Sequence, residues 1–206
     1  MVMVTLVRHS VLQLVSVRIP GTVKSIGSKV FDNCKALRRF DMPATVTTLG
    51  NMSFRHAEAL QSVTFSEVLT TIGNAAFQYC VSLVNVELHA GITRIGNFAF
   101  ADTSVAEVTL PETLKEIGMG AFTENFHLET ISLPASLEKV ETGAFFDCIG
   151  LRYAVFAGSP PMDWGEFVFG SEIMDEETLK SAVTICYMDA NSGWTSPVWT
   201  DLYGIS

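Results

Sequence analysis

Four cysteines and four histidines are the residues of this chain best suited to nucleophilic or metal chemistry. A thiolate beside an imidazole can act as nucleophile and base, and several such groups together bind zinc. Cys34, Cys80 and Cys148 instead share one position of a recurring unit, whereas the histidines fall at different positions of it. The sequence therefore predicts neither a metal cluster nor a cysteine–histidine pair. It predicts free thiols, because equivalent positions two units apart are separated by about 10 Å, which is too far for a disulfide.

A second candidate is the group Asp163, Trp164 and Glu166, in which two acids lie on either side of an aromatic residue. Paired carboxylates next to an aromatic side chain suit carbohydrate chemistry. A hydrolase-type or carbohydrate-active site in this irregular C-terminal region is therefore an alternative function. A capping loop is the simpler interpretation, and we favour it. The chain is predicted to have no catalytic residues, no metal and no cofactor.

A unit that recurs six times must position all of these residues. One copy is IGNAAFQYC (72–80), and the others repeat its pattern of glycine and phenylalanine with or without the cysteine. Successive units are 23 residues apart, except that the fourth is one residue short. A fixed period of roughly 20–29 residues is typical of stacked leucine-rich units. The units begin at Ile19, Met42, Phe65, Leu88, Leu110 and Leu133.

Each recurring position predicts a structural role. Glycine is expected where a turn needs backbone freedom, so Glu141 at this position of the sixth unit predicts a distorted turn. The segment L-x-x-V-x-L alternates apolar and polar residues and predicts one short strand per unit. Phe77 and Cys80 are three residues apart, which fits a short helical or irregular turn. The phenylalanines predict an aromatic column inside the stack, made of Phe31, Phe54, Phe77, Phe100, Phe122 and Phe145.

These elements predict an α/β solenoid, a right-handed leucine-rich repeat stack with one parallel β-sheet, six repeats and terminal caps. No single unit can bury its apolar face, so the stack as a whole provides the stability. The predicted domains are an N-terminal cap with a leading strand (1–18), the solenoid (19–156) and a C-terminal cap (157–206). Within the last, residues 171–180 predict a helix and 182–188 a final strand. The short fourth unit allows a bend or a misaligned strand at 105–110.

Composition excludes other classes of function. A net charge of −9 argues against nucleic acid as a partner, because phosphate binding needs a basic surface. No apolar run approaches the roughly 18 residues that a membrane span requires. The start, MVMVTLVRHS, is apolar and then basic, which is the reverse of a secretory signal. Either a leader was removed or none was present, and the sequence leaves both open.

The repeating pattern I-P-x-x-V-x-x-I-G-x-x-A-F-x-x-C-x-x-L-x-x-V resembles the BspA-like, or Treponema pallidum type, leucine-rich repeat. The resemblance covers residues 11–156 and recurs six times in register. Members of that family are largely surface or secreted proteins of host-associated anaerobes, spirochetes and some protists. Those studied act as adhesins or protein-binding modules. The resemblance therefore implies a non-catalytic binding module at the cell surface or secreted, with a host surface or matrix protein as one expected partner.

The predicted strands place two residues per unit on the concave side of the sheet, where we expect a partner protein to bind. The chain itself is expected to be a monomer. The first five pairs are polar, whereas the sixth is apolar and lies beside the apolar loop PPMDWGEFVF. This arrangement predicts an apolar pocket for a small hydrophobic ligand or side chain. Alternatively, the loop buries Tyr153 as part of the cap. The predicted binding residues are Arg39, Asp41, Ser62, Thr64, Asn85, Glu87, Glu107, Thr109, Thr130, Ser132, Tyr153, Val155, Trp164 and Phe167.

Overall fold

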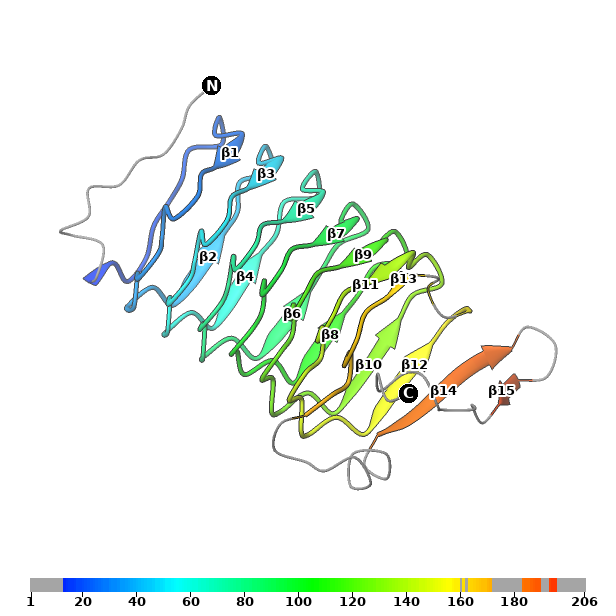
Figure 1. Cartoon of the computed structure of the whole chain (residues 1–206). Coiled ribbons are helices and arrows are strands. Elements are labelled where there is room, and N and C mark those ends of the chain that lie inside the picture. Colours follow the sequence, from blue (N-terminus) through cyan, green and yellow to red (C-terminus); the bar gives the residue numbers. More distant parts are fainter. Residues whose placement is uncertain (1–12, 160, 162, 172–182, 190–192, 196–206) are drawn as a thin grey trace.

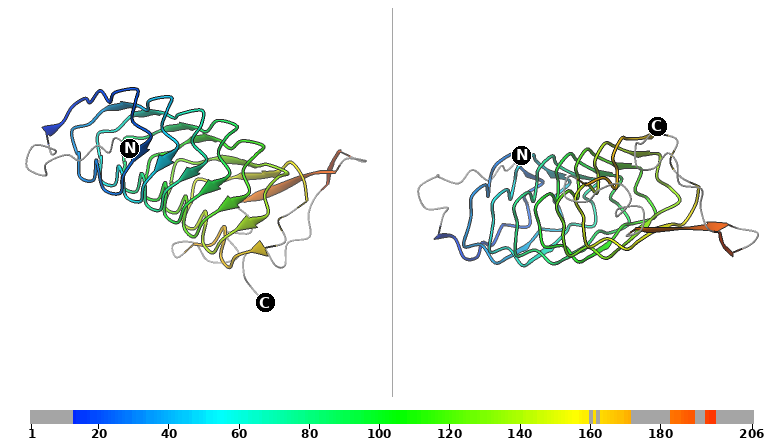
Figure 2. Two further views of the ribbon diagram at one scale, coloured as in Figure 1. Left: turned by 90° about the horizontal axis from the view of Figure 1, so that it is seen from above. Right: turned by 60° about the horizontal axis from the view of Figure 1, so that its bottom comes forward.

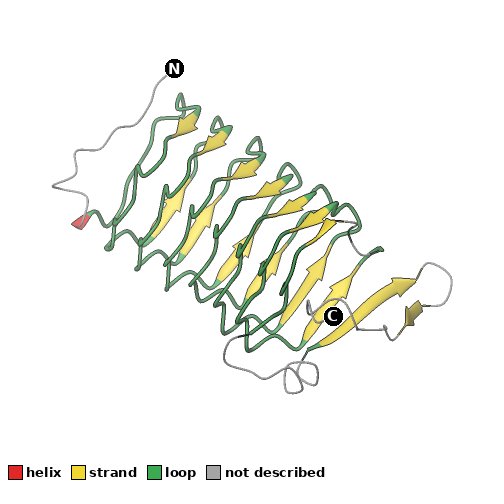
Figure 3. Ribbon diagram, viewed as in Figure 1, coloured by secondary structure: helices red, strands yellow, loops and turns green. Residues whose placement is uncertain are grey.

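The structure is a computed structural model that describes residues 13–159, 161, 163–171, 183–189 and 193–195. The chain forms a solenoid whose coils stack along one long axis (Figures 1 and 2). Strands are joined by loops and turns, and helix is confined to residue 13 within the described chain (Figure 3). This architecture confirms the predicted leucine-rich repeat stack of parallel strands.

One row of strands coincides with the predicted L-x-x-V-x-L segments. Its members pair in parallel with neighbours one coil away, and a short antiparallel strand, β15 (Gly193–Thr195), pairs with the last of them. The final strand of the row confirms the strand predicted at 182–188. We call the outer surface of this row the long-strand face. The row comprises β2 (Arg39–Asp41), β4 (Ser62–Thr64), β6 (Asn85–Glu87), β8 (Glu107–Thr109), β10 (Thr130–Leu133), β12 (Tyr153–Phe156) and β14 (Thr184–Asp189).

A second row of strands, which the sequence did not predict, lies just before the recurring glycine. Each member has two residues, of which the first faces out and the second packs inside. Such a pair is too short to show a period of two, so the pattern gave no signal. We call its outer surface the short-strand face. The row comprises β1 (Ser25–Ile26), β3 (Thr48–Leu49), β5 (Thr71–Ile72), β7 (Arg94–Ile95), β9 (Glu116–Ile117), β11 (Lys139–Val140) and β13 (Asp163–Trp164).

The predicted phenylalanine column runs through the interior between the two rows. Neighbouring rings from Phe31 to Phe145 are stacked with centroids 5.0–5.4 Å apart, and all six side chains are buried. The column continues to Phe169, whose ring lies 5.5 Å from that of Phe145. The aromatic spacing therefore reports the rise from one coil to the next.

A seventh coil begins in the segment that the sequence analysis treated as a capping loop. Trp164 pairs in register with Val140, and the amide of Gly165 donates to the Val140 carbonyl at 2.7 Å, as the recurring glycines do in earlier coils. Phe169 then takes the phenylalanine position. The unit was missed because tryptophan replaces the aliphatic residue and because Phe145 and Phe169 are 24 residues apart.

The turns that follow the recurring glycine are not helical. Two residues four positions apart in most coils have left-handed backbone, for example Ala75 (φ 51°) with Tyr79 (φ 62°). Amides of these turns donate to carbonyls of the next coil, as from Ala75 to Asn97 at 2.7 Å and from Phe77 to Ala99 at 2.8 Å. The spacing of three residues between Phe77 and Cys80 fits this turn as well as it fits a helix. The sequence therefore could not distinguish the irregular turn from the helical one.

The recurring glycine is needed for close approach of successive coils. A Cβ added to Gly50 would lie 2.5 Å from the Ser28 amide nitrogen, and none of the glycines of this column has left-handed φ. The predicted reason, backbone freedom, is therefore wrong. Glu141 at the same position keeps the inter-coil bond, since its amide donates to the Ile117 carbonyl at 2.9 Å.

In the short fourth unit, the side chain of Asn125 replaces a backbone carbonyl as a hydrogen-bond acceptor. In other coils the amide before the long strand donates to the turn, as from Leu83 to the Cys80 carbonyl at 2.9 Å. In the short unit the Val105 amide instead donates to the Asn125 Oδ1 at 3.2 Å. β8 stays in register with β6, whereas no strand pairing joins β8 to β10 within the described chain. The long-strand row is interrupted there and also between β4 and β6, where no unit is short, so the interruption is not specific to the short unit. The misaligned strand expected at 105–110 is not observed, because β8 keeps its register.

The two ends match their predictions in part. Residues 14–20 contain no strand, so the predicted leading strand is wrong there; one backbone bond, from the Arg38 amide to the Val15 carbonyl, replaces a ladder. The predicted helix at 171–180 lies outside the described residues, except for Ser171. The boundaries of the three predicted domains remain predictions.

Candidate functional site

The predicted binding pairs of β2 to β12 all point outward from the long-strand face. Strand pleating alternates them with buried residues such as Phe40, Val86 and Ile131, which anchor the strands on the core. Every member of these pairs is exposed except Val155, which is half-buried. The outward orientation predicted for these pairs is therefore observed, whereas their role in binding remains a prediction.

Side-chain contacts on this face are concentrated at its N-terminal end. Arg39 Nε donates to Asp41 Oδ1 at 3.1 Å, and the Thr64 hydroxyl donates to the same oxygen at 3.0 Å. No side-chain hydrogen bond or ion pair joins the outward residues of β6, β8 and β10 to other described residues. Their hydroxyl, amide and carboxylate groups are open to a partner.

The C-terminal end of the long-strand face contains its largest exposed apolar side chain. Tyr153 is 49% exposed, and β14 adds Thr184 beside Tyr153 and Cys186 beside Val155. Cys186 is a half-buried free thiol. The face therefore changes along its length from a paired Arg39–Asp41 end, through a middle of polar and acidic groups that are unpaired among the described residues, to an end with an exposed tyrosine.

Trp164 and Phe167 lie away from that end of the face. Trp164 belongs to the short-strand row and points inside, where its ring centroid is 5.7 Å from that of Phe156 and 6.0 Å from that of Phe169. Phe167 is 45% exposed on the following turn. The structure therefore does not bring Trp164 together with Tyr153, because the two residues occupy different rows.

The acidic pair of the alternative function does not form a cleft around Trp164. Asp163 and Trp164 are successive strand residues, one exposed and one half-buried toward the core. The Asp163 carboxylate pairs with Lys139 Nζ at 3.4 Å, and Glu166 lies in the next turn with an exposed side chain. Nothing in this geometry favours a glycosidase over a structural coil.

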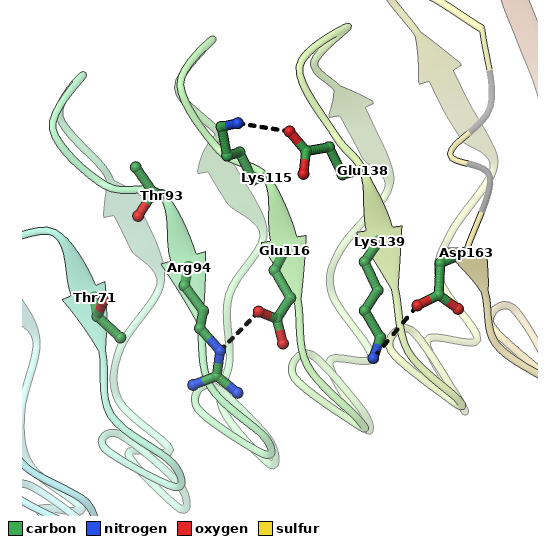
Figure 4. Close-up of a pocket in the computed structure, with 8 residues that line it drawn as sticks. All are labelled: Thr71, Thr93, Arg94, Lys115, Glu116, Glu138, Lys139 and Asp163. Carbon is green, nitrogen blue, oxygen red and sulfur yellow. Dashed lines mark hydrogen bonds and ion pairs between the residues drawn. The ribbon is translucent and has the colours of Figure 1, made fainter.

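A shallow groove of about 500 Å³ crosses the short-strand face (Figure 4). Basic and acidic side chains alternate along it from one coil to the next. Arg94 Nε lies 2.9 Å from Glu116 Oε2, and Lys115 Nζ lies 2.6 Å from Glu138 Oε1. Sequence reasoning missed these residues, although their alternating charge at one repeat position was a readable signal. The groove is lined by Thr71, Thr93, Arg94, Lys115, Glu116, Glu138, Lys139 and Asp163.

The three buried cysteines are poorly suited to nucleophilic chemistry. Burial raises the pKa of the Cys34 thiol to about 12 and that of Cys148 to about 12, and it also raises the pKa of Cys80. Cys80 and Cys148 donate to phenylalanine carbonyls of the preceding coil at 3.2 and 3.0 Å. The cysteine position therefore serves to link coils.

Two of the four histidines make local contacts in the described chain. His56 stacks on Tyr79 with ring centroids 4.4 Å apart, and His89 Nδ1 accepts a hydrogen bond from the Gly91 amide at 2.9 Å. Among the described residues, no three His, Cys, Asp or Glu side chains gather as a metal site. In the same part of the chain no helix is long and apolar enough to cross a membrane.

This chain resembles known proteins in both its repeats and its fold. Its repeats match the family described as BspA type leucine rich repeat region over residues 9–125 and 70–190, in six copies. The chain belongs to this family. The BspA-type repeat thus accounts for the phenylalanine column, the glycine of close approach and the two rows of strands. No curated protein matches the chain significantly.

Solved leucine-rich repeat structures share the fold. The T. pallidum leucine rich repeat protein is 27% identical with a TM-score of 0.66, covering 79% of this chain and 78% of that one. A leucine-rich repeat protein from Bacteroides ovatus is 24% identical with a TM-score of 0.63, covering 82% of this chain. A leucine rich cell surface protein from Faecalibacterium prausnitzii is 18% identical with a TM-score of 0.54, covering 84%. This chain spans 54% and 53% of the last two proteins' lengths.

Proposed function

We propose that this BspA-type chain is a non-catalytic protein-binding module that uses its long-strand face. The observation that carries the proposal is the row of exposed outward pairs from β2 to β12, whose middle section has no side-chain partner among the described residues. Short strands on a rigid stack hold these side chains at fixed spacing. A partner can therefore bind without first ordering them, which lowers the entropic cost of association.

The character of the face indicates how a partner would be recognised. Serine, threonine and asparagine of β4, β6 and β10 offer hydrogen-bond donors and acceptors to a polar surface. Tyr153 supplies a large aromatic side chain at one end, and tyrosine is enriched among the residues that dominate binding energies. We infer a protein partner with an apolar contact opposite Tyr153 and polar contacts along the rest of the face.

An adhesin-like role at the cell surface is part of the proposal. It rests on membership of the BspA-type family and on a structural neighbour described as a cell surface protein. A host surface or matrix protein is accordingly the proposed partner, and a small hydrophobic ligand near Tyr153 and Val155 is a secondary one.

The test is binding of the purified chain to a panel of immobilised extracellular-matrix proteins, followed by variants of the long-strand face. Tyr153→Ala and Thr64→Arg should each weaken binding of the selected matrix protein by at least about tenfold, because one removes an aromatic contact and the other adds unmatched bulk and charge. Thr48→Arg, at an outward position of the short-strand face, is the matched control and should stay within about twofold of the wild type.

Equal binding by all three variants would show that the long-strand face is not the site. If no matrix protein binds the wild type, the adhesin role is wrong. Circular dichroism and thermal unfolding of each variant separate loss of the site from loss of the fold.

A further inference from the structure

We propose that the short-strand face binds a second copy of this chain, forming a two-fold symmetric dimer through strands β7 to β13. The proposal is independent of the long-strand face and its partner. It is carried by the order of charges along the groove of Figure 4, which is complementary to itself when reversed.

Charges of opposite sign follow one another along the short-strand face. The outward position of β7, β9, β11 and β13 holds Arg94, Glu116, Lys139 and Asp163, so the signs alternate from coil to coil. The position before it places Lys115 beside Glu138 one coil away. These side chains remain between 28% and 66% exposed despite their ion pairs. Each can therefore contact a charge from outside.

The spacing of the charges matches a second stack of coils better than it matches an extended peptide. Coils rise by about the 5.2 Å that separates rings of the phenylalanine column, for example Phe77 and Phe100. An extended peptide lying along the stack repeats its same-side residues about every 7 Å, so it would fall out of step with the ladder. Another stack of coils has the same rise and stays in step along the whole face. A second copy of this chain is such a stack.

Symmetry then fixes the register. A two-fold axis between β9 and β11, parallel to the strands, places Arg94 against the partner's Asp163 and Glu116 against the partner's Lys139. The same axis places Lys115 against the partner's Glu138. Every charge along both positions then meets its opposite.

Neighbouring registers lack this property. An axis through β9 would bring Glu116 against the partner's Glu116, and an axis through β11 would oppose the two copies of Lys139. An axis between β7 and β9 would place Lys139 against the partner's Thr71, so most charges would face neutral groups. Juxtaposed like charges repel each other and disfavour these registers. The charge order therefore specifies one arrangement.

The test is sedimentation velocity of the full chain between about 10 and 500 µM, where a polar interface of modest size should dimerise. We expect a dimer at low ionic strength whose Kd rises at least about tenfold in half-molar salt, because exposed charge pairs are screened. Lys139→Glu and Glu116→Lys should each raise the Kd at least about tenfold on their own. Thr48→Glu, on the same face outside the overlap, should leave it within about twofold.

The deciding measurement mixes the two charge-reversal variants. In an equimolar mixture, the two negative side chains of Lys139→Glu face the two positive ones of Glu116→Lys, so a heterodimer should form with a Kd within about threefold of the wild type. A wild-type monomer over the whole concentration range overturns the proposal. So does a dimer that both variants leave intact, or a mixture that does not associate. Thermal unfolding of each variant confirms that loss of the dimer is not loss of the fold.

Discussion

The two faces of the solenoid are built from the same repeat but present different chemistry. On the long-strand face, the outward residues of β6, β8 and β10 are polar or acidic and have no side-chain partners in the described chain, and Tyr153 stands exposed at one end. On the short-strand face, charges of opposite sign alternate and pair from coil to coil. The repeat thus fixes the interior, while each outward position is free to vary. A face with open groups suits a different protein, and a face with an alternating ladder suits a copy of itself.

The largest expected effect comes from the interior that both faces share. Phe77→Ala removes a ring stacked between Phe54 and Phe100, and it should lower the free energy of unfolding by about 3–5 kcal/mol. Urea denaturation measures this loss, and it should weaken both faces together. Phe126→Ala, at a phenylalanine that is 44% exposed, is the control and should change stability by less than about 0.5 kcal/mol. Equal losses for the two variants would contradict the column.

A second substitution should destabilise the long-strand row more than the short-strand row. Asn125→Ala removes the acceptor of the Val105 amide and the donor to the carbonyls of Phe100 and Phe122, so we expect a loss of about 3 kcal/mol. Because Val105 leads into β8, hydrogen exchange should accelerate more in the long strand of that coil than in β9. Cys80→Ala provides the comparison at the same repeat position, with an expected loss of about 1 kcal/mol. Uniform acceleration across both rows would count against this role of Asn125.

A third substitution, at the recurring glycine that follows each short strand, should destabilise the packing of neighbouring coils. A Cβ added to Gly73 would lie 2.7 Å from the Gly50 carbonyl carbon, so Gly73→Ala forces the coils apart and should cost about 2 kcal/mol. Gly21→Ala is the matched control, since nothing lies within 4 Å of its added Cβ. Thermal unfolding should place that variant at or slightly above the wild type. A stable Gly73→Ala protein would show that close approach does not explain the glycine column.

The smallest expected effect concerns proton binding on the short-strand face. A hydrogen bond from Lys139 lowers the pKa of Glu141 below its ordinary value of 4.5. Since the folded pKa is lowered, the stabilisation is present above 4.5 and is lost as pH falls through the lower folded value. NMR titration of the Glu141 carboxyl should show its pKa rising in Lys139→Met. An unchanged titration would exclude the contact in solution.

Sequence predicted the features that repeat without exception. Six phenylalanines at spacings of 22 or 23 residues gave the column, and alternation around Val86 gave the long strands with their outward pairs. Features that depend on contacts between coils gave no local signal. Two-residue strands such as Thr71–Ile72 show no period, and left-handed turns have the same apolar spacing as a helix.

The seventh coil and the role of Asn125 were missed for a related reason. Trp164 occupies an aliphatic position in the seventh coil, so a rule based on residue type passed over it. The role of Asn125 depends on a gap one coil away, at the short fourth unit. Both are visible only once neighbouring coils are placed side by side.

The left-handed residues of the turns have a consequence for how the chain folds. Left-handed backbone costs a non-glycine residue about 1 kcal/mol or more, and most coils contain two such residues, as at His56 (φ 58°) with Met52 (φ 58°). The bonds that offset this cost come from the next coil, as from the His56 amide to the Gln78 carbonyl at 2.8 Å. An isolated coil is thus intrinsically unstable, and the coupling between neighbours is correspondingly strong. In a nearest-neighbour description this combination makes nucleation slow and propagation fast, so partly folded stacks should be sparsely populated at equilibrium.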